Sequence, residues 1–143
     1  MEQLFGLANL TVMPFWGLMI LAPGWSWTQR LLRTPFVAIL PALGYALLVV
    51  PDLASILPVV MNPKLEAVAA LLGTPRGATI GWLHFLAFDL LVGRQVYLDA
   101  RERRIPAWLS SPILFFVLML GPVGFLLHLA LRSVYRRSHE TRT

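Results

Sequence analysis

Polar and ionisable side chains interrupt a long apolar segment of this chain, residues 82–99. The segment is close to the length that crosses a bilayer as a helix. Ionisable groups in a spanning helix are costly and usually face a bundle interior, a cavity or a partner, where they have a function. Histidine and carboxylate groups are the ones that proteins most often use for proton transfer. The segment therefore predicts the functional helix, and its polar residues are His84, Asp89, Arg94, Gln95, Tyr97 and Asp99.

The composition is typical of a membrane protein. The chain is 57% hydrophobic and only 13% charged, whereas about 25% charged residues are usual in a soluble domain. Several apolar runs approach the length of a membrane span. The chain has no cysteine, which excludes disulfides, thiolate metal sites and cysteine nucleophiles.

Four apolar segments are long enough to be membrane spans, at about residues 4–22, 36–60, 78–100 and 109–131. We expect a kink or break near Pro51 in the second, and a kink or close helix approach at Gly121 and Pro122 in the fourth. Residues 65–73 predict a short interfacial helix ended by Gly73. The expected fold is all-α: one four-helix transmembrane domain over residues 1–132 and a polar basic tail over 133–143.

The arginines lie near the ends of these spans, where anionic lipid headgroups are the expected partner, and we expect no nucleic acid. With four spans, the loops 23–35 and 101–108 share one face of the membrane with five cationic residues. The loop 61–77, Arg132 and the tail share the opposite face with six. This margin is too small for the positive-inside rule to assign an orientation. The N-terminus lacks a basic region, so we expect a retained first span without a transit peptide, in a bacterial inner or photosynthetic membrane.

The expected depth of each polar group follows from its place along a span. In four antiparallel spans, one half of the membrane collects Asn9, Asp52, His84 and His128, with Asp89 near the centre. The other half holds Arg94, Gln95, Tyr97 and Asp99, which we expect to anchor the helix. Around the third helix these groups point in different directions, so each needs a partner elsewhere. Trp16 and Trp82 either mark the membrane interface or line a groove for a flat or polyene ligand.

Three sequence runs resemble the abscisic-acid-deficient-four-like family of membrane proteins: MPFWGLMILAP at 13–23, WLHFLAFDLLVGRQVYLDARERRIP at 82–106, and GPVGFLLH at 121–128. The resemblance covers about residues 12–131. Family members in plants are required for making neoxanthin from violaxanthin. The resemblance therefore implies a carotenoid substrate and an isomerisation, in which an acid assists opening of a 5,6-epoxide and a base removes a proton to leave an allene. That chemistry needs no redox cofactor.

Three functions stay open. The first is a neoxanthin synthase-like isomerase acting on a carotenoid or related isoprenoid, with His84 and Asp89 as the acid–base pair and His128 assisting. The second is a non-catalytic carotenoid-binding or accessory subunit of a photosynthetic or biosynthetic membrane complex. The third is a membrane protein that ligates haem or a metal ion through His84 and His128, although we expect no cofactor and no metal. Residues expected to bind substrate or support the site are Asn9, Trp16, Asp52, Trp82, Arg94, Gln95, Tyr97 and Asp99.

Overall fold

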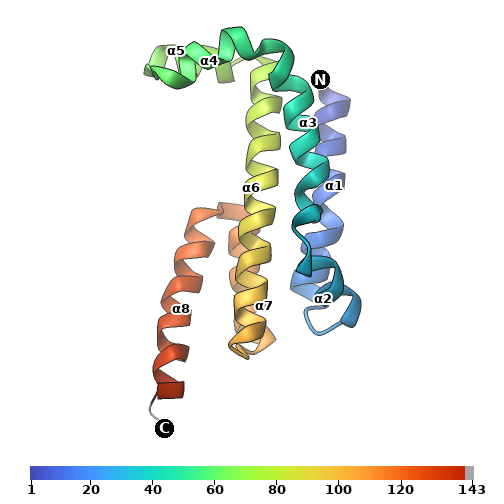
Figure 1. The fold of residues 1–143 in the computed structure, drawn as a ribbon, viewed down its shortest axis with the longest axis vertical. Coiled ribbons are helices and arrows are strands. Elements are labelled where there is room, and N and C mark those ends of the chain that lie inside the picture. The colour runs from blue at the N-terminus through green and yellow to red at the C-terminus, as the bar shows by residue number, and fades with distance from the viewer. Residues whose placement is uncertain (141–143) are drawn as a thin grey trace. The chain divides into compact units, whose positions relative to one another are not determined.

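A computed structural model describes residues 1–140, with side chains described up to residue 135. Its secondary structure is entirely helical over that range, which confirms the all-α prediction (Figure 1). The helices are α1 Glu2–Leu21, α2 Ser26–Arg33, η1 Pro35–Ala38, α3 Ile39–Val49, η2 Val50–Asp52, α4 Leu53–Met61, α5 Leu65–Leu72, α6 Pro75–Glu102, α7 Ala107–Leu120 and α8 Pro122–Glu140. Residues 141–143 of the expected tail lie outside the described part of the chain.

Two stretches are long and apolar enough to cross a membrane, judged by length and composition: Glu2–Leu21 and Pro35–Met61. They match the first two predicted spans and indicate that the chain associates with a membrane. Helix α6 is longer than the third predicted span, with 28 residues. Its polar side chains lower its hydropathy, and its crossing stays a prediction. The four-span arrangement is not confirmed.

The chain divides into two compact units. The first unit comprises residues 1–12 and 38–88, and the second comprises residues 13–37 and 89–143. Helices α1 and α6 each contribute residues to both units. Each unit has its own buried apolar residues: Val12, Leu48 and Leu83 belong to the first, and Leu90, Val96, Leu114 and Val117 to the second.

In the first unit, α3 packs closely on α6. A side chain at Gly44 would lie 3.3 Å from Leu83, so the small residue permits this approach. The chain then breaks at η2, which contains Pro51, and α4 turns away from the direction of α3 (Figure 1). Proline lacks an amide N–H and clashes with the preceding helical turn, which explains the break. This outcome confirms the predicted break near Pro51, and the helix expected at 65–73 is present as α5, with Gly73 as its C-cap.

In the second unit, the predicted fourth span is wrong as a single helix. The segment 109–131 is divided between α7 and α8, which pack against each other as an antiparallel hairpin (Figure 1). Gly121 has a φ of +38°, a value that side chains disfavour, and Pro122 cannot continue the preceding ladder of hydrogen bonds. A side chain at Gly124 would lie 2.2 Å from the backbone nitrogen of Val117, so the two helices touch at their backbones. The close helix approach expected at Gly121 and Pro122 is therefore confirmed. In place of the expected kink, the chain reverses its direction there.

Candidate functional site

A cleft of about 370 Å³ lies within the first unit, between α3, the α4–α5 hairpin and α6. Its walls are almost entirely apolar. Helix α4 contributes Ile56, Val59 and Val60, and α5 contributes Val68, Leu71 and Leu72. This volume is within the range of small-molecule sites.

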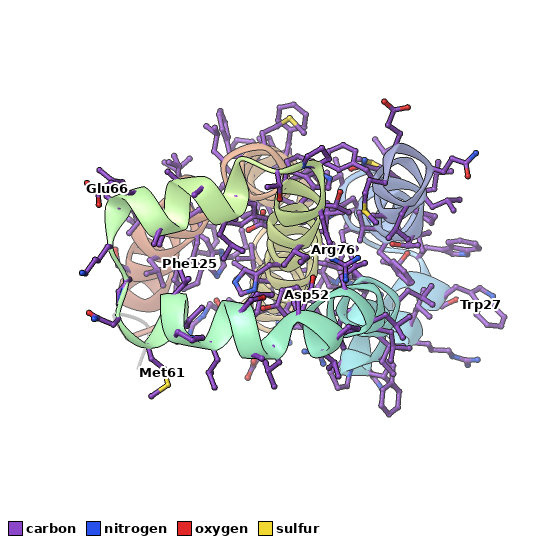
Figure 2. The ribbon with its side chains drawn as sticks, turned by 90° about the horizontal axis from the view of Figure 1, so that it is seen from above. Trp27, Asp52, Met61, Glu66, Arg76 and Phe125 are labelled. Carbon is purple, nitrogen blue, oxygen red and sulfur yellow. The ribbon has the colours of Figure 1, made fainter. Side chains whose placement is uncertain are left out.

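Local sequence explains how the cleft forms. Four residues of α6 line the cleft: Ile80, Gly81, His84 and Phe85. They form two adjacent pairs four residues apart, so they share one face of the helix. At Gly81 a side chain would lie 3.3 Å from Leu72, so glycine keeps α5 close to α6. The break at η2 turns α4 across this face, and α5 returns beside α4 (Figure 2).

Arg76 stabilises the break between α3 and α4, which gives the cleft its shape. Its guanidinium forms an ion pair with Asp52 and donates a hydrogen bond to the carbonyl oxygen of Leu48 at 3.0 Å. Figure 2 shows Arg76 and Asp52 facing each other. The contact joins the start of α6 to both the end of α3 and η2. Asp52 therefore supports the fold here, and no hydrogen bond or ion pair joins it to His84 among the described residues.

His84 contributes its imidazole to the lining of the cleft. Its ring stacks on Phe88 at a centroid distance of 4.7 Å and lies 5.5 Å from the ring of Tyr45. Within the described part of the chain, neither ring nitrogen has a hydrogen-bond partner. A neutral imidazole carries one N–H donor and one acceptor nitrogen. His84 can therefore exchange a proton with a bound molecule, as the sequence predicted, although its catalytic role stays a prediction.

Tyr45 is the site residue that the sequence reading missed. It lies on α3, lines the same cleft and has no hydrogen-bond partner among the described residues. Its phenol can donate or accept a hydrogen bond. The only signal in the sequence is a lone tyrosine inside an otherwise apolar stretch, and such a residue often marks a membrane interface instead.

Asn9 and Trp82 form a small polar contact in the first unit. The Asn9 side-chain oxygen accepts a hydrogen bond from the Trp82 indole at 2.9 Å, and Trp82 stacks on Phe5 at 5.4 Å. The Asn9 amide nitrogen donates to the Phe5 carbonyl oxygen at 3.0 Å. This arrangement satisfies both polar groups of Asn9. The contact joins α1 to α6. Neither Asn9 nor Trp82 lines the cleft that contains His84.

The second unit contains a separate ionic cluster around Asp99. The carboxylate lies 2.9 Å from Nε2 of His128, 3.0 Å from Nε of Arg103 and 3.8 Å from Arg132. The Asp99 and His128 side chains are only 12% and 3% exposed. The expected position of His128 in the opposite half of the membrane from Asp99 is therefore wrong. The cause is the reversal at Gly121, which carries His128 back to the end of α6 where Asp99 stands.

Asp89 lies against the α7–α8 turn. A side chain built on Gly121 would come within 2.6 Å of the Asp89 carboxylate. No hydrogen bond or ion pair to Asp89 occurs in the described residues. The carboxylate therefore lies beside the residue that precedes α8, where free N–H groups and the helix dipole favour negative charge. Its expected role as an acid or base stays a prediction.

The remaining predicted residues support the second unit. Arg94 donates hydrogen bonds to the carbonyl oxygens of Leu32, Arg33 and Thr34, which close the C-terminal end of α2. The Tyr97 hydroxyl donates to Pro23 at 2.7 Å.

Trp16 and Gln95 differ in their surroundings. Trp16 is buried, and a side chain at Gly93 would come within 2.3 Å of its indole, so the indole packs directly on the α6 backbone. Gln95 is exposed and has no hydrogen-bond partner among the described residues. The described residues contain no group of three or more histidine or acidic side chains arranged to hold a metal ion. Ligation of haem or a metal by His84 and His128 stays an untested prediction.

The helical fold and the two membrane-length apolar stretches define a helical membrane-associated protein. A family model described as ABA DEFICIENT 4-like matches residues 3–128, and the chain belongs to that family. This match confirms the family resemblance seen in the sequence.

One relative is the protein named ABA DEFICIENT 4, chloroplastic, of Arabidopsis thaliana. It is 26% identical over 146 residues, which cover 97% of this chain and 64% of the relative. The chain thus spans somewhat less than two thirds of that protein's length. No solved structure matches the chain.

Proposed function

We propose that this chain is an integral membrane protein that isomerises an epoxycarotenoid or a related oxygenated isoprenoid. The observation that carries the proposal is the apolar cleft of the first unit, in which neither the His84 imidazole nor the Tyr45 hydroxyl has a hydrogen-bond partner among the described residues. Membership of the ABA DEFICIENT 4-like family supports a carotenoid-related substrate. The apolar walls suit a hydrocarbon ring, and the two polar groups suit its oxygen.

The proposed reaction needs one proton donor and one proton acceptor. The Tyr45 phenol donates a proton to the epoxide oxygen, and the bond from that oxygen to the ring carbon next to the polyene breaks. His84 removes the proton from the adjacent polyene carbon, and the electron pair of that C–H bond forms the second double bond of the allene. The product has the same atoms as the substrate, so no redox partner is required. The two rings lie 5.5 Å apart, which lets one end group contact both.

The remainder of the substrate does not fit the cleft. A cleft of about 370 Å³ takes a ring and the first part of a polyene, and the rest of the polyene extends along the exposed apolar surface. Phe85 and Phe88 are exposed on α6 next to His84 and provide such a surface. This mode of binding places only the reacting end near polar groups.

The direct test is conversion of violaxanthin by the purified full-length chain in detergent, followed by chromatography, absorption and mass. We expect a product of unchanged mass with the spectrum of an allenic carotenoid. His84→Gln and Tyr45→Phe should each lower kcat by about 10²- to 10⁴-fold, the usual contribution of a positioned acid or base. Tyr135→Phe is the matched control, because Tyr135 does not line the cleft. No conversion of violaxanthin or another epoxycarotenoid by the wild-type chain would exclude the proposal.

A cleft-filling variant tests the location of the site. Val68→Phe adds a ring to a wall of the cleft and should raise KM or abolish carotenoid binding while leaving His84 intact. Leu65→Phe on the same helix is the control, because Leu65 is exposed and does not line the cleft. Carotenoid that copurifies unchanged and is lost in Val68→Phe would instead favour the pigment-binding subunit. Equal conversion by both variants would place the reaction outside this cleft.

A further inference from the structure

The α7–α8 hairpin is too short to cross a membrane in either direction. Helix α7 has 14 residues, which span about 21 Å, whereas the hydrocarbon core is about 30 Å thick. The apolar part of α8 is shorter still, because the polar sequence RSVYRRSHE begins at Arg132. Both helices nevertheless expose apolar side chains, including Phe115, Met119 and Leu126. Such a surface fits a hairpin that enters the hydrocarbon region without crossing it.

The turn itself has the features that a turn at membrane depth requires. The Gly121 N–H donates to Val117 at 2.8 Å, and its carbonyl oxygen accepts from Phe125 at 3.1 Å. Pro122 has no N–H to satisfy. Gly121 is buried, with the Asp89 carboxylate against it. A non-helical backbone is tolerated inside a bilayer only when protein buries it and satisfies its polar groups, as happens here.

Contacts with α6 fix the direction of α8. Asp89 lies at Gly121, and ten residues further along α6, Asp99 contacts His128 and Arg132. Later residues of α6 thus contact later residues of α8, which means that the two helices run in the same direction. The C-terminal end of α8 therefore returns to the end of α6 that carries Arg101 and Arg103, and not to the opposite face.

Most of the described positively charged side chains belong to the second unit. Nine lysine and arginine residues have described side chains, and seven of them belong to the second unit: Arg30, Arg33, Arg94, Arg101, Arg103, Arg104 and Arg132. Of the other two, Arg76 stands in the first turn of α6, the end opposite to Arg101. Trp25, Trp27 and Trp108 are exposed in the second unit, and exposed tryptophan is typical of the membrane–water interface.

We propose that α7 and α8 form a re-entrant hairpin and that the basic end of the second unit, from Arg101 and Arg104 to Arg132, binds anionic phospholipid headgroups of the cytoplasmic leaflet. Arg101 and Arg104 are exposed, and Arg132 is 44% exposed, so their guanidinium groups are accessible to lipid phosphates. The positive-inside rule places an end with this excess of arginine on the cytoplasmic side. The C-terminal end of α8 then lies on the same side as the loop at 103–106. The cationic residues, which the four-span arrangement divided almost equally between the two faces, then lie mostly on one face.

Single-cysteine labelling tests the hairpin cleanly, because the chain has no native cysteine. We would place one cysteine in each full-length variant, as Asn62→Cys, Glu102→Cys or Ser133→Cys. A membrane-impermeant maleimide is then applied to intact cells of a bacterial host and to inside-out vesicles. Positions 102 and 133 should react only in the inside-out vesicles, and position 62 should react in intact cells. Reaction of 102 and 133 from opposite faces would overturn the hairpin, and reaction of both in intact cells alone would overturn the orientation.

The lipid contact has its own readout. The chain is placed in bilayer discs of phosphatidylcholine with and without phosphatidylglycerol, and the lipid that it retains is measured by native mass spectrometry. We expect preferential retention of phosphatidylglycerol, reduced by about fivefold for each arginine lost in Arg101→Gln/Arg104→Gln. Lys64→Gln removes a charge from the loop between α4 and α5 and should leave the preference unchanged. Equal retention of both lipids by the wild-type chain would overturn the lipid contact.

Discussion

The carboxylate of Asp99 on α6 lies 2.9 Å from the Nε2 atom of His128 on α8. Both side chains are almost fully buried, and Arg103 and Arg132 contact the same carboxylate. One carboxylate thus joins the end of α6 to the returning helix. The assisting role expected of His128 stays a prediction.

Removing the Asp99 charge should destabilise the second unit. Asp99→Asn weakens charged contacts to three neighbours, and hydrogen bonds to charged groups contribute about 1.5–3 kcal/mol each. We expect a loss of about 2 kcal/mol in the free energy of unfolding, measured by thermal or denaturant unfolding in detergent. Arg132→Gln is the control and should cost less than about 1 kcal/mol, because that contact is 3.8 Å long and exposed. An equal loss in both variants would contradict this ranking.

Gly121→Ala should destabilise the hairpin turn. The added carbon meets the Asp89 carboxylate, and the φ of +38° disfavours any side chain. Backbone strain of this kind costs about 1–3 kcal/mol. Gly17→Ala is the matched control, because a side chain there meets nothing within 4 Å inside α1 and alanine favours a helix. Unfolding curves of the two variants should shift in opposite directions, and a neutral Gly121→Ala would show that the turn has another conformation.

Gly93 and Trp16 should show strong energetic coupling. An alanine at Gly93 comes within 2.3 Å of the Trp16 indole, which is buried and has little room to move. Overpacking of this kind costs about 1–3 kcal/mol. Trp16→Phe removes one ring and should recover much of that loss in the double variant. A double-mutant cycle of unfolding free energies measures the coupling, and additive losses would contradict the direct contact.

Arg94→Lys should not be a conservative change. The guanidinium donates to three carbonyl groups at the end of α2, at 2.7, 3.1 and 2.8 Å. An ammonium is a point donor and cannot reproduce this planar arrangement. We expect a loss of about 1–3 kcal/mol and faster hydrogen exchange in α2. The Arg33 side chain makes no hydrogen bond or ion pair within the described part of the chain. Arg33→Lys therefore serves as the control and should leave the exchange of α2 amides unchanged.

Much of the helical fold could be predicted from local sequence. Apolar runs predict α1 and α6, and Gly73 marks the end of α5. Pro51 marks the break because its ring and missing N–H act on its own turn of the chain. Helix α2 was missed because it is short, polar and held by Arg94, which lies 60 residues further along. Local signals predict local geometry well, whereas a distant contact leaves none.

The candidate site shows the same limit. The sequence identified His84 because an ionisable group inside an apolar helix is conspicuous. It missed Tyr45, which becomes informative only when the fold places it 5.5 Å from His84 in one cleft. Asp52 was expected near His84 at the same depth, but it pairs with Arg76. Depth along a helix does not determine which face a side chain takes or which neighbour it meets.

The sequence by itself determined that the chain is helical and associated with a membrane, and it determined the family, because these depend on composition, periodicity and motifs. Only the tertiary structure decided whether Gly121 and Pro122 bend a single span or reverse it. Apolar residues lie on both sides of that pair in the sequence. The apolar pattern is therefore the same whether the chain continues or reverses there. The reversal follows from the backbone conformation at Gly121 and from the packing of Gly124 on Val117. It brings His128 and Arg132 of α8 to Asp99, near the end of α6.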